Sequence, residues 1–246
     1  MPRCMVSDPY LLMWLEAPLQ SWGADSRFGR RDSHDFPTRS GVLGLICCAL
    51  GRGGAQREWL AQLADYPQRV TAYVRTQTFG DSEPVRVARE PLLRDFHMVG
   101  AGYDLNDPWQ KLLEPHKSDG KPRKSDGGGT KMTYRYYLQD MAYAIILPLP
   151  TAESDAIAEA LQNPCWDLYL GRKSCVPTDF IFRGLYESGE EAELAAGAIA
   201  AEKERAVDFW VLSGEHEGEV ITLNDVPIQF GSHKQYRDRR VTVITV

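Results

Sequence analysis

The sequence predicts an α+β fold, and three observations lead to this prediction. Short apolar runs at residues 10–15 and 142–149 have the length of buried strands. A run at residues 42–50 is apolar on nearly every face and is flanked by helix signals. A segment rich in glycine, lysine and aspartate at residues 100–130 separates two strand-like segments, as in a long hairpin. A chain of 246 residues can bury this core as one large or two small domains.

The first predicted strand, at residues 10–15, ends shortly before Pro18. Gln20, Ser21 and Trp22 follow directly, where such a strand would leave a sheet. The loop after them, at residues 24–35, mixes arginines, beginning with Arg27, with a phenylalanine and a histidine. Bases interleaved with aromatics suit phosphate contact combined with base stacking. A solvated polar loop is the alternative interpretation of this segment.

The next element is a helix that ends at residue 50. Thr38 or Ser40 can cap its start, because a hydroxyl accepts from the free N–H groups of the first turn. Gly51 then ends it in the manner of a left-handed cap. A helix that is apolar all round must be buried. Its start, with Arg39 and the amides of Ser40 and Gly41, can receive a phosphate; a core helix with an exposed arginine at its cap is the alternative.

The later segments complete an alternating order of strands and helices. The predicted helices lie at residues 56–66 and 151–162, with a helical acidic stretch at 190–207. The predicted strands lie at residues 69–78, 84–88, 92–99, 133–138, 142–149, 180–186, 209–212, 219–223 and 240–246. Up to residue 186 the order corresponds to a β-α-β-β-α-β unit of the ferredoxin-like or RRM type with an inserted hairpin.

Two further segments have the composition of nucleic-acid contacts. Around the strand at residues 133–138, basic and aromatic residues alternate, as an RNA-gripping finger requires. The glycine- and lysine-rich segment before it cannot build a core and should be a mobile basic tip; a disordered insertion is the alternative. Arg172, Lys173 and Ser174 follow Gly171 in a basic loop that can cradle a phosphate with its backbone.

The distribution of charge leaves binding to phosphates open, and the cysteine content argues against a disulfide-stabilised protein or a zinc protein. The net charge is −6, but residues 187–225 hold eleven acids and two bases, so the remaining residues sum to +3. A locally basic face can therefore still bind phosphates. The five cysteines are odd in number and form no CxxC pair, which favours free thiols in a cytoplasmic protein over disulfides or a zinc site. We expect no metal or other cofactor, and no membrane span or signal peptide.

Five motifs, in order along the chain, resemble the Cas-five family of CRISPR Cascade subunits, and together they resemble its type I-E members. They are LEAPLQSWG at residues 15–23, FPTRSG at 36–41, RDFH at 94–97, YRYY at 134–137 and YLGRKSC at 169–175. The resemblance implies a RAMP protein with a ferredoxin-like palm at residues 8–78 and 139–187. It also implies an inserted hairpin thumb at 79–138 and a C-terminal extension at 188–246.

The resemblance further implies a function. Proteins of this family bind and cap the 5′ handle of the crRNA within Cascade, beside the large subunit and the backbone RAMP subunits. The assembled complex then recognises target DNA in antiviral defence. Type I-E members do not cleave RNA, whereas type I-C relatives are metal-independent endoribonucleases that process the repeat. The second activity is the alternative function, and its Tyr, Lys and His set has no assigned positions here. His97, His116 and Lys117 are tempting candidates, but residues 116–117 lie in the variable thumb region, and a histidine is more often structural.

With this resemblance, the predicted RNA-binding residues fall into phosphate ligands and stacking residues. The phosphate ligands are led by Arg39, Arg172 and Lys173. Trp22, Tyr134 and Tyr137 can stack on splayed bases, although Trp22 could instead pack in the core. The full predicted set is Gln20, Ser21, Trp22, Arg27, Arg39, Ser40, Gly41, Arg94, His97, Lys131, Tyr134, Arg135, Tyr137, Arg172, Lys173 and Ser174. We predict no catalytic residue.

Overall fold

The structure is a computed structural model that describes residues 8–24, 26, 29–80, 82–99, 106, 108–109, 118–119, 121 and 131–246. For Val99 and Lys131 it describes the backbone alone. Arg27, His116, Lys117 and most of the predicted basic tip therefore lie outside the described residues. Within the described part, the protein is a mixed α and β structure with four helices and mostly antiparallel sheets.

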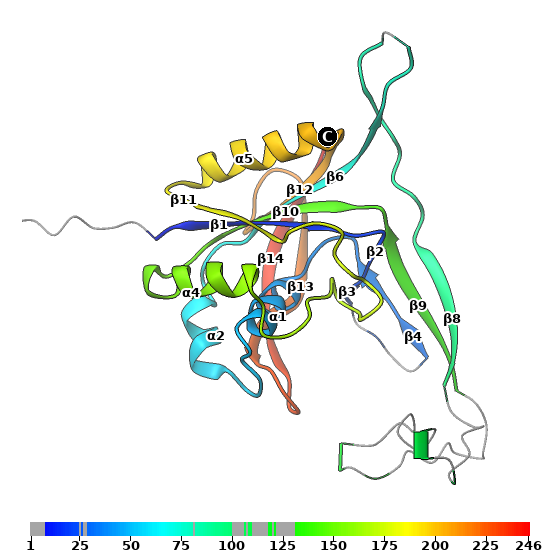
Figure 1. The fold of residues 1–246 in the computed structure, drawn as a ribbon, viewed down its shortest axis with the longest axis vertical. Coiled ribbons are helices and arrows are strands. Elements are labelled where there is room, and N and C mark those ends of the chain that lie inside the picture. The colour runs from blue at the N-terminus through cyan, green and yellow to red at the C-terminus, as the bar shows by residue number, and fades with distance from the viewer. Residues whose placement is uncertain are drawn as a thin grey trace, which may run out of the picture.

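A large sheet of antiparallel neighbours forms the centre of the molecule (Figure 1). Its strand order is β11 (Phe182–Tyr186), β1 (Tyr10–Glu16), β10 (Ala142–Pro148), β6 (Arg69–Gln77), β12 (Arg205–Ser213), β14 (Gln235–Thr245) and β13 (Glu219–Gln229). The short strand β7 (Val85–Arg86) also pairs with β6. The apolar runs in β1 and β10 were expected to be buried, and both strands lie inside this sheet.

The two faces of this sheet are covered by different helices. Leu11, Met13 and Leu15 of β1 belong to one core cluster, whereas Leu12 and Trp14 belong to the other. Both faces of the strand are thus buried, which explains its continuous apolar run in place of an alternating one.

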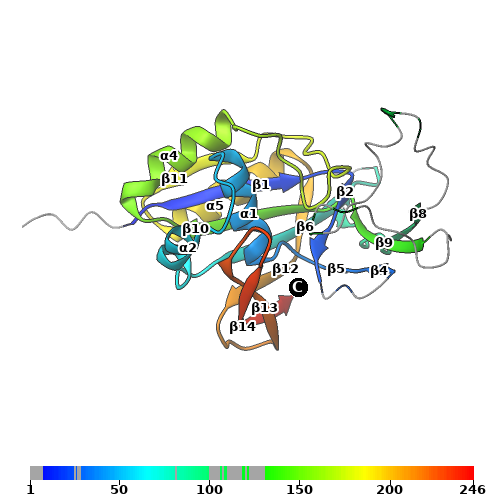
Figure 2. The same ribbon diagram turned by 90° about the horizontal axis from the view of Figure 1, so that it is seen from below.

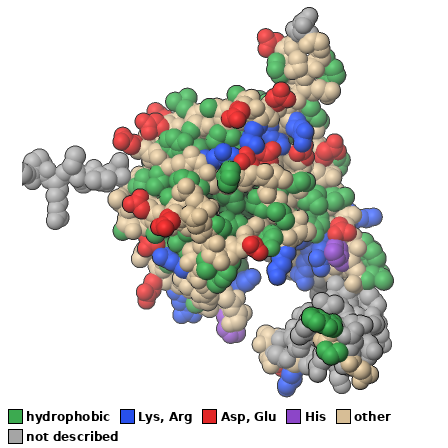
Figure 3. All heavy atoms as spheres, in the orientation of Figure 1, with side chains coloured by type: hydrophobic (Ala, Val, Ile, Leu, Met, Phe, Trp, Pro, Cys, Tyr) green, Lys and Arg blue, Asp and Glu red, His purple; other side chains and the backbone are tan. Residues whose placement is uncertain are grey.

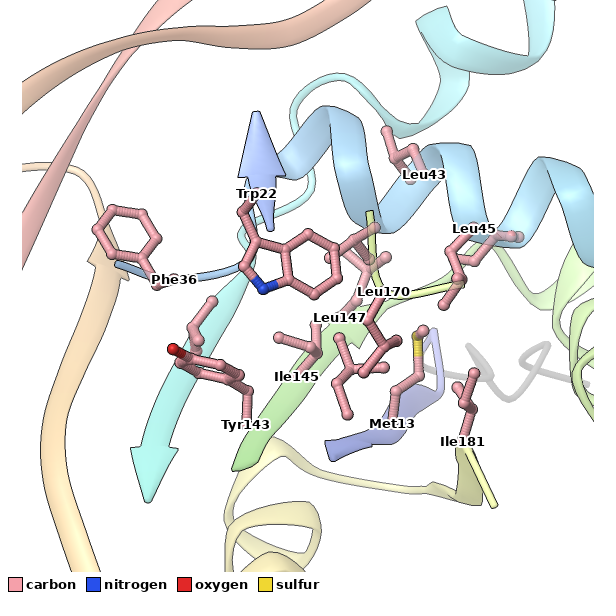
Figure 4. Close-up of a cluster of buried hydrophobic side chains, with 14 of the residues drawn as sticks. Met13, Trp22, Phe36, Leu43, Leu45, Tyr143, Ile145, Leu147, Leu170 and Ile181 are labelled. Carbon is pink, nitrogen blue, oxygen red and sulfur yellow. The ribbon is translucent and has the colours of Figure 1, made fainter. Parts of the chain in front are cut away.

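The first face carries helices α1 (Arg39–Ala49), α2 (Arg57–Leu63) and α4 (Thr151–Gln162), whose apolar residues join the larger cluster. Figure 4 shows side chains from β1, β10 and α1 meeting in this core. Helix α5 (Gly189–Glu202) covers the opposite face (Figure 1). Its buried alanines, Ala192, Ala196 and Ala200, recur every four residues and let its backbone approach the sheet closely.

A second, smaller sheet extends from one end of the first. Its longest strands are β8 (Leu93–Val99) and β9 (Lys131–Gln139), which pair antiparallel and project together from the body (Figure 1). Strand β2 (Leu19–Gln20) pairs antiparallel with β9, and β4 (Arg30–Arg31) pairs parallel with it. Strand β3 (Trp22–Gly23) pairs with β5 (Ser33–His34). The segment after β1 is thereby fixed between the large sheet and the β8–β9 ribbon.

The C-terminal part departs from the sequence prediction in its boundaries. Helix α5 ends at Glu202, before the predicted limit of residue 207, because Glu204 adopts a left-handed φ of +53° and Arg205 already begins β12. Strands β13 and β14 are each eleven residues long and form a projecting hairpin, whereas the sequence predicted shorter strands. Among the described residues, no helix combines the length and apolar character required to span a membrane.

Candidate nucleic-acid interface

A groove of about 640 Å³ runs along helix α1. Besides α1 itself, its walls come from β3 and β4, the turn after α1, the loop after α4 and the tip of the β13–β14 hairpin. Viewed from below, as in Figure 2, α1 lies among these segments, with the hairpin on one side and the short strands β4 and β5 on the other. The groove therefore exists only in the folded chain.

Among the residues that the structure describes, four cations line this groove: Arg31, Arg52, Arg172 and Lys234. Arg31 and Lys234 are exposed. On the face shown in Figure 3, Lys and Arg side chains also gather beside the β8–β9 ribbon. Arg31, Arg172 and Lys234 thus give part of the groove a positive charge, although the whole chain is acidic.

Arg172 is held in a fixed orientation at one end of the groove. Its guanidinium donates hydrogen bonds to the carbonyl oxygens of Tyr136 (3.2 Å) and Arg31 (3.0 Å) and lies 4.6 Å from the centre of the Tyr137 ring. Both hydrogen-bond acceptors are neutral carbonyls, so the positive charge is not cancelled by a carboxylate. This arrangement agrees with a phosphate-binding role for Arg172.

Gly171 allows this loop to reach the groove. It has a φ of +101°, and a Cβ atom at this position would lie 1.7 Å from the carbonyl oxygen of Ser21. The backbone N–H of Ser21 donates to the carbonyl of Leu170 (3.1 Å), which ties the loop to the segment after β1. Lys173 and Ser174 are exposed on the same loop, beside the residues that line the groove.

The prediction that Arg39 binds phosphate is corrected by the structure. Arg39 is 1% exposed, and its guanidinium donates to the carbonyl of Leu63. Burial lowers the pKa of Arg39 to about 10, and the neighbouring Arg239 contributes in the same direction. Its backbone N–H donates to the Asp225 carboxylate (2.8 Å). A carboxylate of the chain itself therefore occupies the start of α1, where a phosphate was expected, and the arginine is not an exposed cap either.

Two further amides of the first turn of α1 are paired within the chain, those of Gly41 and Val42. The predicted cap is confirmed, because the Thr38 hydroxyl accepts from the N–H of Gly41 at 3.2 Å. Ser40 and Gly41 both shape the groove wall, but the Gly41 amide is already paired and is not free to bind an anion.

Gln20, Ser21 and Trp22, which follow shortly after β1, are buried and form hydrogen bonds to neighbouring segments of the fold. Gln20 is fully buried, and its side-chain amide donates to the carbonyls of Leu15 (3.2 Å) and Met141 (2.7 Å). The indole N–H of Trp22 donates to Gln20 (3.2 Å), and the Trp22 ring packs beneath α1, as Figure 4 shows. Trp22 is only 1% exposed. It therefore packs in the core, as the alternative interpretation had it, and the prediction that it stacks on a base is wrong. Ser21 is likewise buried at the groove wall.

Of the predicted RNA-binding residues on the β8–β9 ribbon, some are exposed and others are packed against neighbouring side chains. Tyr134 is 39% exposed, and the Arg94 guanidinium lies 5.5 Å from its ring centre. Tyr137 is buried beneath Arg172, which makes it a packing residue and corrects the prediction of stacking. His97 contacts the carboxylate of Asp95, and Arg135 faces Asp95 across the ribbon. Lys131 is the first residue of β9, and the structure describes its backbone alone.

Sequence reasoning missed several residues that line the groove. They include Arg52, Trp166, Lys234 and Tyr236, which belong to none of the motifs that the sequence singled out. The glycine-rich run after α1 was the single local signal near Arg52. These residues come from segments that meet only through the fold, so no spacing along the chain could have grouped them.

Thiol and metal chemistry find no support at this groove. Burial raises the pKa of Cys47, which lines the groove, to about 12, so its nucleophilic thiolate is scarce at neutral pH. Within the described residues, no group of three or more histidine, cysteine, aspartate or glutamate side chains is placed to hold a metal ion. The arrangement is suited to binding an anionic chain.

Comparisons with known proteins identify the family of this chain. The CRISPR-associated protein family Cas5 matches residues 10–242. The Cascade subunit CasD of Escherichia coli strain K12 is 30% identical over 238 residues, covering 92% of this chain and 94% of the relative. A chain of a CRISPR RNA-guided surveillance complex has 27% identity and a TM-score of 0.64 over 96% of this chain and 90% of its own length. A crystal structure of a Cas protein gives 27% identity and a TM-score of 0.58 over 96% and 94%. The chain therefore belongs to the Cas5 family of CRISPR-associated proteins.

Proposed function

We propose that this protein is a non-catalytic subunit of a type I-E Cascade surveillance complex and binds the 5′ handle of the crRNA in the groove along α1. The observation that carries this proposal is the Arg172 guanidinium, which neutral carbonyls and an aromatic ring hold at the mouth of a basic groove. Phosphates of a single RNA strand are the ligands that such a groove favours. The similarity to a Cascade subunit supports the same choice.

The proposal includes a division of the chain. Strands β1, β6, β10 and β11 with helices α1 and α4 follow the β-α-β-β-α-β order and the sheet order β11-β1-β10-β6, which supports a ferredoxin-like palm at residues 8–78 and 139–187. The β8–β9 ribbon would be the core of the thumb at 79–138. Residues 188–246 would be an extension that covers one face with α5 and lengthens the same sheet through β12, β14 and β13.

The proposed partners follow from this role. The chain would assemble with crRNA, with the large subunit and with backbone subunits of the complex, and would meet target DNA only through that assembly. Its cytoplasmic location is part of the same proposal. The similarity to a chain of an RNA-guided surveillance complex supports these partners as a class.

A second function, metal-independent cleavage of repeat RNA, is favoured by one contact. His97 touches the Asp95 carboxylate on the half-exposed β8–β9 ribbon, and a carboxylate can orient a histidine as a general base. Incubating the purified chain with repeat RNA in the absence of divalent metal tests this alternative. We expect no cleavage; specific cleavage that a His97→Ala variant abolishes would reverse the assignment.

The test of the proposed function is binding of handle RNA to the assembled complex with single groove substitutions. Arg31→Ala and Lys234→Ala should each weaken binding and should each reduce the magnitude of the salt slope by about 0.7, the value for one phosphate contact on a single strand. Arg240→Ala is the matched control, because Arg240 is exposed but pairs with Glu215 outside the groove. Equal effects of all three variants would show that the groove is not the binding site.

A further inference from the structure

The two ends of the groove differ in their surroundings. At the end near the start of α1, Arg172 and Arg31 contact each other through a hydrogen bond (3.0 Å). The other end lies where α1 finishes, at the glycine-rich turn of residues 51–54 and the loop of residues 165–167. Helix α1 has eleven residues, so these ends are about 16 Å apart at 1.5 Å per residue. A single RNA strand lying in the groove could contact both.

The arginine at the far end has its charge balanced. Arg52 forms an ion pair with Glu153 at 3.0 Å, and its guanidinium lies 5.3 Å from the centre of the Trp59 ring. The indole N–H of Trp59 donates to the same Glu153 carboxylate at 3.1 Å, which holds the three side chains together. A phosphate placed here would face a carboxylate as well as the arginine. This end of the groove therefore favours an uncharged group.

A half-exposed indole provides the surface for such a group. Trp166 lines the groove and is 49% exposed. Gly53 beside it presents bare backbone, and a Cβ atom there would be only 3.6 Å from the Trp166 ring. One side of the indole is thus supported by the glycine turn, and about half of its surface is open.

The backbone around Trp166 is anchored to the end of α1. The N–H of Cys165 donates to the carbonyl of Ala49 at 2.8 Å. The thiol of Cys48 donates to the carbonyl of Asp167 at 3.4 Å and contacts that of Trp166 at 3.9 Å. An aromatic ring whose backbone is already fixed loses little conformational freedom when a ligand stacks on it.

We propose that Trp166 is a stacking platform for one unpaired base of the RNA strand, at the far end of the groove from Arg172. This inference rests on the proposed function, since it assumes that the RNA strand occupies the groove. Stacking on an aromatic side chain contributes about 1–3 kcal/mol per base, which corresponds to about 5- to 150-fold in affinity. Because stacking neutralises no phosphate, it leaves the salt slope unchanged.

The experiment measures handle-RNA binding by the assembled complex from low to moderate salt. Trp166→Ala should weaken binding by about 5- to 150-fold with the slope unchanged, and Trp166→Phe, which keeps a stacking ring, should retain most of the affinity. Phe180→Ala is the matched control, because Phe180 is 82% exposed but lies outside the groove. Thermal melting of each variant confirms folding.

An abasic scan of the handle identifies the stacked base. With the unsubstituted chain, removal of one base should weaken binding, and with Trp166→Ala the same removal should have no further effect. An unchanged abasic penalty in Trp166→Ala, or a reduced salt slope in that variant, would overturn the stacking proposal. If Arg31→Ala lowers the slope while Trp166→Ala leaves affinity intact, stacking fails and the proposed function stands; if neither variant has an effect, both fail.

Discussion

At the scale of single residues, the structure shows which of the predicted RNA-binding side chains are accessible and which are buried in the fold. Arg172 lies at the groove and is partly exposed, whereas Arg39 and Trp22, from equally suggestive motifs, are buried. The difference is burial, because the Arg39 guanidinium also donates to a neutral carbonyl, that of Leu63, but is shielded from solvent. Arg172 is bound by carbonyl oxygens, while the start of α1 is already occupied by a carboxylate. Burial and pairing, more than residue type, decide which side chains can meet a ligand.

Gly171 should not tolerate a side chain. A Cβ atom there would overlap the Ser21 carbonyl, and the φ of +101° is strained for any other residue. We expect Gly171→Ala to lower the melting temperature and to weaken RNA binding, because the loop that carries Arg172 must shift. Gly197→Ala is the control, since position 197 is in α5 with open space around it and should be neutral or stabilising. Equal melting temperatures for the two variants would contradict this prediction.

Glu16 should make stability depend on pH. Burial alone would raise its pKa, but hydrogen bonds from Trp14, Lys203 and Arg205 outweigh burial and lower the pKa of Glu16 in the folded protein. A carboxyl whose folded pKa is depressed stabilises the fold above its unfolded pKa, about 4.3. That contribution should be lost as pH falls from about 4.3 through the lower folded pKa.

The measurement for Glu16 is the urea midpoint of the purified chain between about pH 3 and pH 7. Glu16→Gln should flatten the acid limb of this profile, and it should also lower stability at neutral pH because the buried Arg205 loses a charged partner. The exposed Glu219→Gln variant is the control for removal of one carboxylate. An acid limb of unchanged steepness in Glu16→Gln would assign the pH dependence to other carboxyl groups.

At the scale of elements, the β13–β14 hairpin completes the groove and anchors helix α1. Asp225 of β13 accepts from the Arg39 backbone N–H and forms an ion pair with Arg239 of β14 at 2.7 Å. The tip of the same hairpin contributes Lys234 to the groove wall. A change at Asp225 should therefore be transmitted to the helix that lines the groove.

Asp225→Ala should be strongly destabilising. Breaking a buried ion pair by removal of one partner costs about 3–5 kcal/mol, because the remaining charge, here Arg239, stays buried without compensation. The helix start would also lose its anionic partner. Chemical denaturation measures the loss, and Asp238→Ala, on the exposed side of the same hairpin, should change stability by less than about 0.5 kcal/mol. A similar small loss for Asp225→Ala would show that the hairpin does not anchor α1.

At the scale of the whole molecule, charge is divided between regions. Residues 187–225 hold a net −9, and they include α5, which lies on the sheet face opposite α1 and α4 (Figure 1). The groove with its four cations lies on the α1 side. Since charges further apart than about 8–10 Å are screened at physiological salt, the acids carried by α5 should not repel a strand bound in the groove.

RNA binding should accordingly depend on salt although the chain is acidic. With roughly three to six basic contacts, the logarithm of affinity should fall with a slope of about −2 to −4 against the logarithm of salt concentration. Titrations of handle RNA with the assembled complex measure this slope. A slope near zero would mean that the cations of the groove are ordinary solvated surface.

The sequence by itself determined the order of the longer strands and helices, the buried core strands and a hydroxyl cap for α1, which it left open between Thr38 and Ser40. These depend on local periodicity and on neighbouring residues, which are visible along the chain. Only the tertiary structure decided which polar residues remain available to a ligand. The Asp225 carboxylate that fills the start of α1 lies 186 residues away from it, and Trp166, Arg52 and Lys234 meet at the groove from separate segments. Such pairings join residues that are distant in the sequence, so no local sequence pattern could have predicted them.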